Sequence, residues 1–182
     1  MTIAVPWLAV SLDDPNWTLI RNVAIGLVVV GGAREAAEAF VGSAITADPP
    51  VVLPGRLERR DGEVRDGAHN PDGARHLVEQ LDGDDHTVVA SILADKDVDA
   101  MLRILRRVGM RFVATRSSSA RALPADDLAE VARRHFDRVE VVDDPVAAVA
   151  RAHELGEPVL VTGSLYLLGD LEREERRAAW RA

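Results

Sequence analysis

The stretch "EVRDGAHNPDGARHL", residues 63–77, places a strand-like run directly before a helical pattern. Asp61-Gly62, just ahead of it, is a strong two-residue turn signal between the short runs "RLERR" and "EVR", so we predict a hairpin there. Asn70 can cap a helix that has Pro71 at its first position. One apolar stripe at helical spacing then follows (Ala74, Leu77, Val78, Leu81). The stretch therefore predicts a strand end, a polar loop and a helix in immediate succession.

Strand-like runs alternate with helical patterns through the rest of the chain. Further strands are expected at residues 86–92, 110–116, 138–142 and 158–164. Such alternation implies parallel strands joined by right-handed crossovers. We predict an α/β fold, a three-layer Rossmann-like sheet that is mostly parallel, with the strand at residues 56–60 antiparallel at an edge. The charged run "EREERR" in the last helix is expected to face solvent.

Residues 1–50 differ from this pattern. Residues 22–30 and 34–45 have the composition of two helices separated by Gly31-Gly32, and the proline-rich "ADPPVVLPG" follows as a connector. We therefore divide the chain into a short helical segment, residues 1–50, and an α/β domain, residues 51–182.

The composition bounds the class of protein. The 182-residue chain is 47% hydrophobic and 29% charged, which is enough to bury a core. A net charge of −8 argues against a broad nucleic-acid surface, and the absence of cysteine excludes disulfides and thiolate metal sites. The apolar run at residues 23–30 is far shorter than the roughly 20 residues that a membrane span needs. The start "MTIAVPWLAV" lacks the features of a secretory signal, so we expect a cytoplasmic protein without membrane association.

Polar residues collect where the predicted strands end. In open α/β sheets, ligands bind outside the carboxyl ends of the strands, so we expect one rim of the sheet to receive a polar ligand. The groups at these ends are Asp66–Asn70, Asp95-Lys96-Asp97, Ser117–Ser119, Asp143-Asp144 and Thr162-Gly163-Ser164.

Each of these groups also has a structural interpretation. Asp66 and His69 are suited to bonding backbone groups around a tight turn, and as metal ligands they lack a third partner. The serines at residues 117–119 would serve equally well as a helix N-cap region, and Thr162-Gly163-Ser164 as the cap of the last helix. No phosphate loop is present, because the only lysine, Lys96, follows Asp95 rather than glycine. The chain has no complete catalytic apparatus of its own.

Four blocks nevertheless resemble a known family. They are "LPGRLE", "DGAHNPDGA", "ILADKD" and "VLVTGSLY", in this order and spacing. Together they resemble the C-terminal domain of folylpolyglutamate synthase/dihydrofolate synthase, a Mur-type ligase. The resemblance is strong over residues 50–172. It is weaker over residues 22–45, which are similar to the helices that join the family's central ATPase domain to this one.

The resemblance implies an ATP-dependent ligase that joins glutamate to the carboxylate of a folate or dihydropteroate, through an acyl phosphate. Arg56 then corresponds to an arginine that reaches the nucleotide phosphates, and Asp66 and Asn22 to residues that contact the nucleotide. His69 and Ser164 correspond to positions near the incoming glutamate. The family's phosphate loop and Mg²⁺ ligands belong to an N-terminal ATPase domain. That domain would be on another chain or lost by truncation, so we expect this chain to be inactive alone.

Two other interpretations stay open. The chain could be the same domain of another Mur-type ligase, for cell-wall precursors or cyanophycin. It could also be a non-catalytic Rossmann-like module that binds a ligand or another protein.

Overall fold

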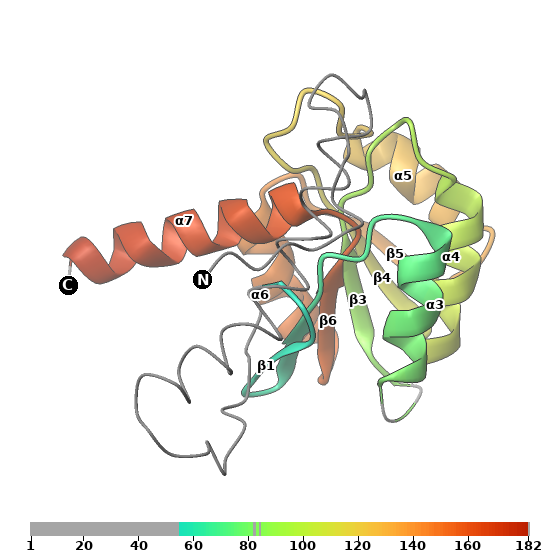
Figure 1. The fold of residues 1–182 in the computed structure, drawn as a ribbon, viewed down its shortest axis with the longest axis horizontal. Helices are drawn as coiled ribbons and strands as arrows, with labels where there is room; N and C mark the ends of the chain where they lie inside the picture. The colour runs from blue at the N-terminus through green and yellow to red at the C-terminus, as the bar shows by residue number, and fades with distance from the viewer. Residues whose placement is uncertain (1–54, 82, 84, 182) are drawn as a thin grey trace, which may run out of the picture. The chain divides into compact units, whose positions relative to one another are not determined.

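The computed structural model describes residues 55–181 except residues 82 and 84. These residues form one six-stranded sheet with the strand order β1-β2-β6-β3-β4-β5 (Figure 1). The strands are β1 (Glu58–Arg60), β2 (Glu63–Arg65), β3 (Thr87–Ala90), β4 (Arg111–Ala114), β5 (Arg138–Val141) and β6 (Val159–Thr162). Residues 1–50, including the two predicted helices and Asn22, lie outside the described residues.

The sheet confirms the predicted topology. Five strands pair in parallel, in the order β2-β6-β3-β4-β5. At one edge, β1 pairs antiparallel with β2. Asp61-Gly62 forms the turn between β1 and β2, and Gly62 has a φ of 68°, a left-handed value that glycine adopts without strain. β1 starts at Glu58, two residues later than predicted.

Helices cover both faces of the sheet (Figure 1). On one face lie α3 (Pro71–Glu79), α4 (Val98–Leu105) and α5 (Ala125–Ala132), and on the other α6 (Pro145–Leu155) and α7 (Leu165–Arg181). Each face has its own apolar cluster, the first around Phe112 and Leu102 and the second around Val113 and Leu167. Strands buried on both faces need apolar residues at successive positions, which explains runs such as "TVVA" in β3. No helix in the described part of the chain is long and apolar enough to cross a membrane.

Local signals set most helix starts. The Asn70 side chain accepts a hydrogen bond from the Gly73 amide, and Pro71 is the first residue of α3, as predicted. α6 begins in the same way after Asp144. α5 begins after Pro124 without a side-chain cap, so the interpretation of serines 117–119 as its N-cap region is wrong.

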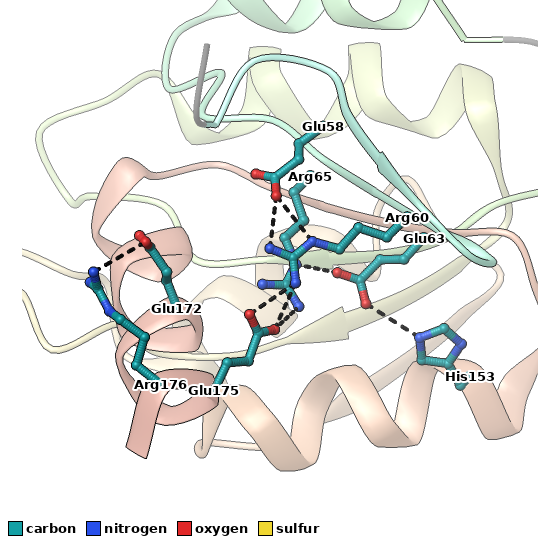
Figure 2. Close-up of polar contacts among 8 residues, drawn as sticks. All are labelled: Glu58, Arg60, Glu63, Arg65, His153, Glu172, Glu175 and Arg176. Carbon is teal, nitrogen blue, oxygen red and sulfur yellow. Dashed lines mark hydrogen bonds and ion pairs between the residues drawn. The ribbon is translucent and has the colours of Figure 1, made fainter. Parts of the chain in front are cut away.

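A network of ion pairs joins the β1–β2 hairpin to α7 (Figure 2). Arg65 is buried and bonds the buried carboxylate of Glu63, and its Nη2 lies 2.7 Å from Oε1 of Glu175 on α7. The other oxygen of Glu63 lies 3.3 Å from Nε2 of His153 on α6. These ion pairs therefore link one strand, β2, to two helices, α6 and α7.

Arg60 extends this network on the exposed side of the hairpin. Its guanidinium lies 2.9 Å from Glu175 and 2.8 Å from Glu58. We call these residues the hairpin–α7 ion network (Glu58, Arg60, Glu63, Arg65, His153, Glu175). Glu175 belongs to the run predicted to face solvent and is exposed as predicted, and it also pairs with two arginines, which the sequence did not predict.

Candidate functional site

The loops that carry the predicted site residues meet at the carboxyl edge of the sheet. Because β1 is antiparallel to β2, the start of β1 and the end of β2 lie at the same edge, which places Arg56 beside Asp66 and His69. The Gly67 amide donates to the Gly55 carbonyl at 2.8 Å and thereby ties these two segments together. The β6–α7 loop with Ser164 joins them through a 3.0 Å bond from the Gly163 amide to the Ala68 carbonyl. Four of the five predicted residues thus lie along one edge, and the fifth, Asn22, is outside the described residues.

Asp66 uses both carboxylate oxygens to hold the backbone. Oδ2 accepts from the Leu57 amide at 2.9 Å and Oδ1 from the Ala68 amide at 2.8 Å, and the side chain is buried. The structural interpretation of Asp66 is therefore confirmed. Each carboxylate oxygen can accept a further bond, so a nucleotide contact stays a prediction.

Gly67, in the loop between β2 and α3, lies against the start of α7. A Cβ at this position would collide with the side chain of Leu165, the first residue of α7. The glycine allows the first turn of α7 to pack on the β2–α3 loop.

His69 has a defined tautomer when neutral. Its Nδ1 lies 2.9 Å from the Gly67 carbonyl oxygen, which can only accept, so Nδ1 carries the proton. In the neutral ring Nε2 is then the free acceptor. This geometry gives His69 one nitrogen that could take a proton from a ligand.

Ser164 caps the last helix. Its Oγ accepts a hydrogen bond from the Tyr166 amide at 3.0 Å, and the residue is buried. The predicted capping function of this segment is confirmed, and the O–H of Ser164 keeps its own proton available for donation.

The predicted residues line two separate pockets. Arg56 and Asp66 line one of about 350 Å³ together with His76 of α3. The Arg56 side chain is exposed and makes no hydrogen bond or ion pair with another described residue, so its guanidinium is available to a ligand. His69 and Ser164 line a second pocket of about 200 Å³.

The second pocket contains three residues that the sequence did not identify as site residues. Lys96, Arg121 and Tyr166 line it beside His69 and Ser164. Lys96 belongs to one of the polar groups that the sequence placed at the strand ends, but no specific role was predicted for it. Arg121 carries no local signal, because its place depends on how the long loop between β4 and α5 folds back.

Comparisons with known proteins identify the family of this domain. Residues 55–165 match the family described as "Mur ligase, glutamate ligase domain". The chain belongs to this family. It is 36% identical over 121 residues to folylpolyglutamate synthase of Lacticaseibacillus casei. This alignment covers 63% of the chain and 28% of that relative. It is also 40% identical over 103 residues to dihydrofolate synthase/folylpolyglutamate synthase of Mycobacterium tuberculosis, covering 52% of this chain and 21% of that protein.

A solved structure of a relative has the same fold. The M. tuberculosis folylpolyglutamate synthase complexed with ADP and AMPPCP superposes with a TM-score of 0.64 at 32% identity, over 75% of this chain and 36% of that chain. The Mur ligase chain described here thus spans well under half the length of these relatives. Its fold and family follow from the comparisons.

Proposed function

We propose that this Mur ligase domain is the glutamate-adding part of an ATP-dependent folylpolyglutamate/dihydrofolate synthase. The observation that carries the proposal is the placement of two pockets on one edge of the sheet. One contains the Arg56 guanidinium, which has no partner among the described residues, and the other contains His69 and Ser164. The family match and the folylpolyglutamate synthase relatives support the substrate class.

In the proposed reaction, a carboxylate oxygen of a folate or dihydropteroate attacks the terminal phosphorus of ATP, and ADP leaves. The glutamate amine then attacks the carbonyl carbon of the acyl phosphate, and inorganic phosphate leaves. Arg56 binds nucleotide phosphate oxygens, which a guanidinium suits through its fork of donors. Asp66 holds the segment that carries Arg56 and contacts the nucleotide with its remaining lone pairs, and Asn22 contributes a further nucleotide contact.

His69 and Ser164 serve the second half of the reaction. Nε2 of neutral His69 accepts the proton that the amine loses as the amide bond forms. The O–H of Ser164 donates to an oxygen of the bound glutamate. Both residues are held by backbone contacts, so they are in position before a ligand arrives.

We assign the Mg²⁺ ligands of the proposed enzyme to a domain outside this chain. Residues 55–181, leaving aside 82 and 84, contain no group of three or more His, Asp or Glu side chains placed to hold a metal ion. The steps assigned above to the residues of this chain do not pass through the ion. The proposed partner is therefore an N-terminal ATPase domain that brings the phosphate loop and the Mg²⁺ ligands, and this chain is inactive without it.

The test is to mix this chain with a separately expressed ATPase domain of a folylpolyglutamate synthase and to measure product formation with ATP, glutamate and dihydropteroate or folate. We expect glutamate-dependent product only from the mixture. Arg56→Gln should lower the rate about 100-fold, by analogy with the removal of one donor that stabilises developing charge. Arg59→Gln is the matched control, because Arg59 is also exposed on this segment but bonds the Gln80 carbonyl.

Two outcomes would contradict the proposal. A mixture that stays silent although both parts are folded favours the non-catalytic binding module. A mixture that prefers an amino acid other than glutamate favours another Mur-type ligase.

A further inference from the structure

A groove of about 550 Å³ lies between α6 and α7. Apolar side chains of both helices line it (Val146, Val149, Ala150, Leu171, Ala178). None of its residues lines either pocket of the proposed reaction, so the groove is a separate feature of the molecule. Val146 is 46% exposed beside it. An apolar surface that faces solvent in this way marks a place where another segment packs.

The second half of α7 carries a large apolar residue away from the core. This part of the helix extends beyond the sheet (Figure 1), and every side chain from Glu172 to Arg181 is exposed. Trp180 is 92% exposed, more than any other large apolar side chain in the described part of the chain. An indole is one of the largest apolar groups that a protein can bury, and tryptophan is enriched in protein interfaces. The exposed Trp180 therefore indicates a contact with another chain.

The two faces of α7 match the two sides of the groove. Leu171, Glu175 and Ala178 recur at helical spacing and form the face of α7 that lines the groove. Trp180 follows Leu171 by nine residues, which is about two and a half turns, so it lies on the opposite face. A second α7 that enters the groove can thus pack its Ala178 face on the first α7. Its Trp180 then points to the apolar side chains of α6.

The groove and the end of α7 carry opposite charges. The ionisable side chains of the groove are three carboxylates, one arginine and one histidine (Asp144, Glu174, Glu175, Arg65, His153), which gives an acidic balance. The end of α7, residues 176–182, has the sequence RRAAWRA, with three arginines and no acidic residue. The end of one α7 is therefore complementary in charge to the groove of another.

We propose that the groove receives the end of α7 from a second copy of this chain, so that two copies exchange these ends about a two-fold axis. The two helices run antiparallel and are centred between residues 177 and 178. Glu174 of each copy then lies beside Arg181 of the other, because the two positions are equally far from that centre. In a two-fold interface every contact occurs twice. Two indoles bury about 300–500 Å², a substantial part of the roughly 1,200 Å² of a small specific interface.

The experiment is sedimentation equilibrium of the full chain from about 1 μM to 1 mM, the range of a reversible dimer. We expect the average mass to rise from 19.7 kDa, the mass of one chain, towards twice this value. Trp180→Ala should raise the dissociation constant at least about 30-fold, as for other interface tryptophans. Met110→Ala is the matched control, because this exposed apolar side chain precedes β4 and lies outside the groove. A chain that stays monomeric, or a dimer that Trp180→Ala leaves intact, would overturn the inference.

Charge reversal tests the antiparallel register. Glu174→Arg and Arg181→Glu should each weaken the dimer about tenfold, since each places two like charges side by side. The double variant restores opposite charges and should dimerise nearly as well as the wild type. Both side chains are exposed, so neither change threatens folding. A double variant weaker than either single variant would exclude this register and overturn the inference.

The result does not depend on the proposed ligase reaction. If the wild-type chain stays monomeric, but Trp180→Ala slows product formation in the mixture with the ATPase domain, the end of α7 binds that domain. The inference then fails and the proposed function stands. If the mixture is silent but the chain dimerises through Trp180, the proposed reaction fails and the dimer surface stands.

Discussion

The carboxyl edge of the sheet and the hairpin–α7 ion network both concentrate charge, but they use it differently. In the network, the buried charges of Glu63 and Arg65 are paired within the protein (Figure 2). At the carboxyl edge, Arg56 is unpaired among the described residues and the cations Lys96 and Arg121 share one carboxylate. Charges that a fold needs for itself are satisfied internally, whereas an excess of cations on preformed loops indicates a place for an anionic ligand.

The largest effect is expected from breaking the network at Arg65. Arg65→Ala leaves the Glu63 carboxylate buried with only His153 beside it, and we expect a loss of about 3–5 kcal/mol in the free energy of unfolding, as for other broken buried pairs. Urea denaturation followed by circular dichroism measures this. Arg176→Ala removes an exposed arginine that lies 3.4 Å from Glu172 and should change stability by less than about 1 kcal/mol. Equal effects of the two substitutions would contradict the distinction between buried and exposed pairs.

The next effect concerns Asp66. It lies at the carboxyl edge, but its charge is satisfied within the protein, as the charges of the hairpin–α7 ion network are. Asp66→Ala leaves the Leu57 and Ala68 amides without their acceptor, and we expect a loss of about 2–4 kcal/mol from these two bonds to a charged group. His76→Ala, in the same pocket, should have little effect on stability because the side chain is exposed. A stable Asp66→Ala protein would mean that the carboxylate serves the ligand alone.

A smaller effect is expected at Gly163, where β6 turns into α7 close to β3. Gly163 has a φ of 97°, and a Cβ there would lie 2.8 Å from the Ser91 carbonyl oxygen. Gly163→Ala should therefore cost about 1–3 kcal/mol and disturb the loop that holds Ser164. Gly169→Ala, inside α7 with open space at its Cβ, should instead stabilise the protein by about 0.5–1 kcal/mol. Thermal unfolding of both variants measures these two changes in stability. If Gly163→Ala leaves the stability unchanged, the loop can move to accommodate the added Cβ.

Local sequence signals predicted the part of the molecule that depends on neighbouring residues. The Asp61-Gly62 turn, the Asn70 cap and the apolar stripe of α3 each act over a few residues, and each is present in the structure. The strand alternation then determined the sheet class, and the rule for parallel sheets placed Arg56, Asp66, His69 and Ser164 on one edge.

Contacts between distant segments could not be predicted in this way. Glu175 was predicted to face solvent and is exposed, but its ion pairs with two arginines more than a hundred residues earlier in the chain were not predicted. Arg121 lies at the pocket because the main chain of its loop hydrogen-bonds the loop after β3. Main-chain pairing of two loops leaves no pattern of side chains in the sequence, so it could not be predicted.

The smallest effect concerns the pH dependence of the network through His153. Burial opposes the charged form of this imidazole, but the carboxylates of Glu157 and Glu63 outweigh burial and raise its pKa above the ordinary value. A raised folded-state pKa contributes stability that is fully present below pH 6.5 and is lost as the pH rises through the folded pKa. His153→Gln should therefore reduce the fall in stability between about pH 6 and pH 8, by less than about 1 kcal/mol because the side chain is partly exposed. Urea midpoints at several pH values measure this, with His76→Gln as the control. If the wild type and His153→Gln show the same pH profile, the imidazole takes no part in the pairing, and the buried Glu63 depends on Arg65 alone.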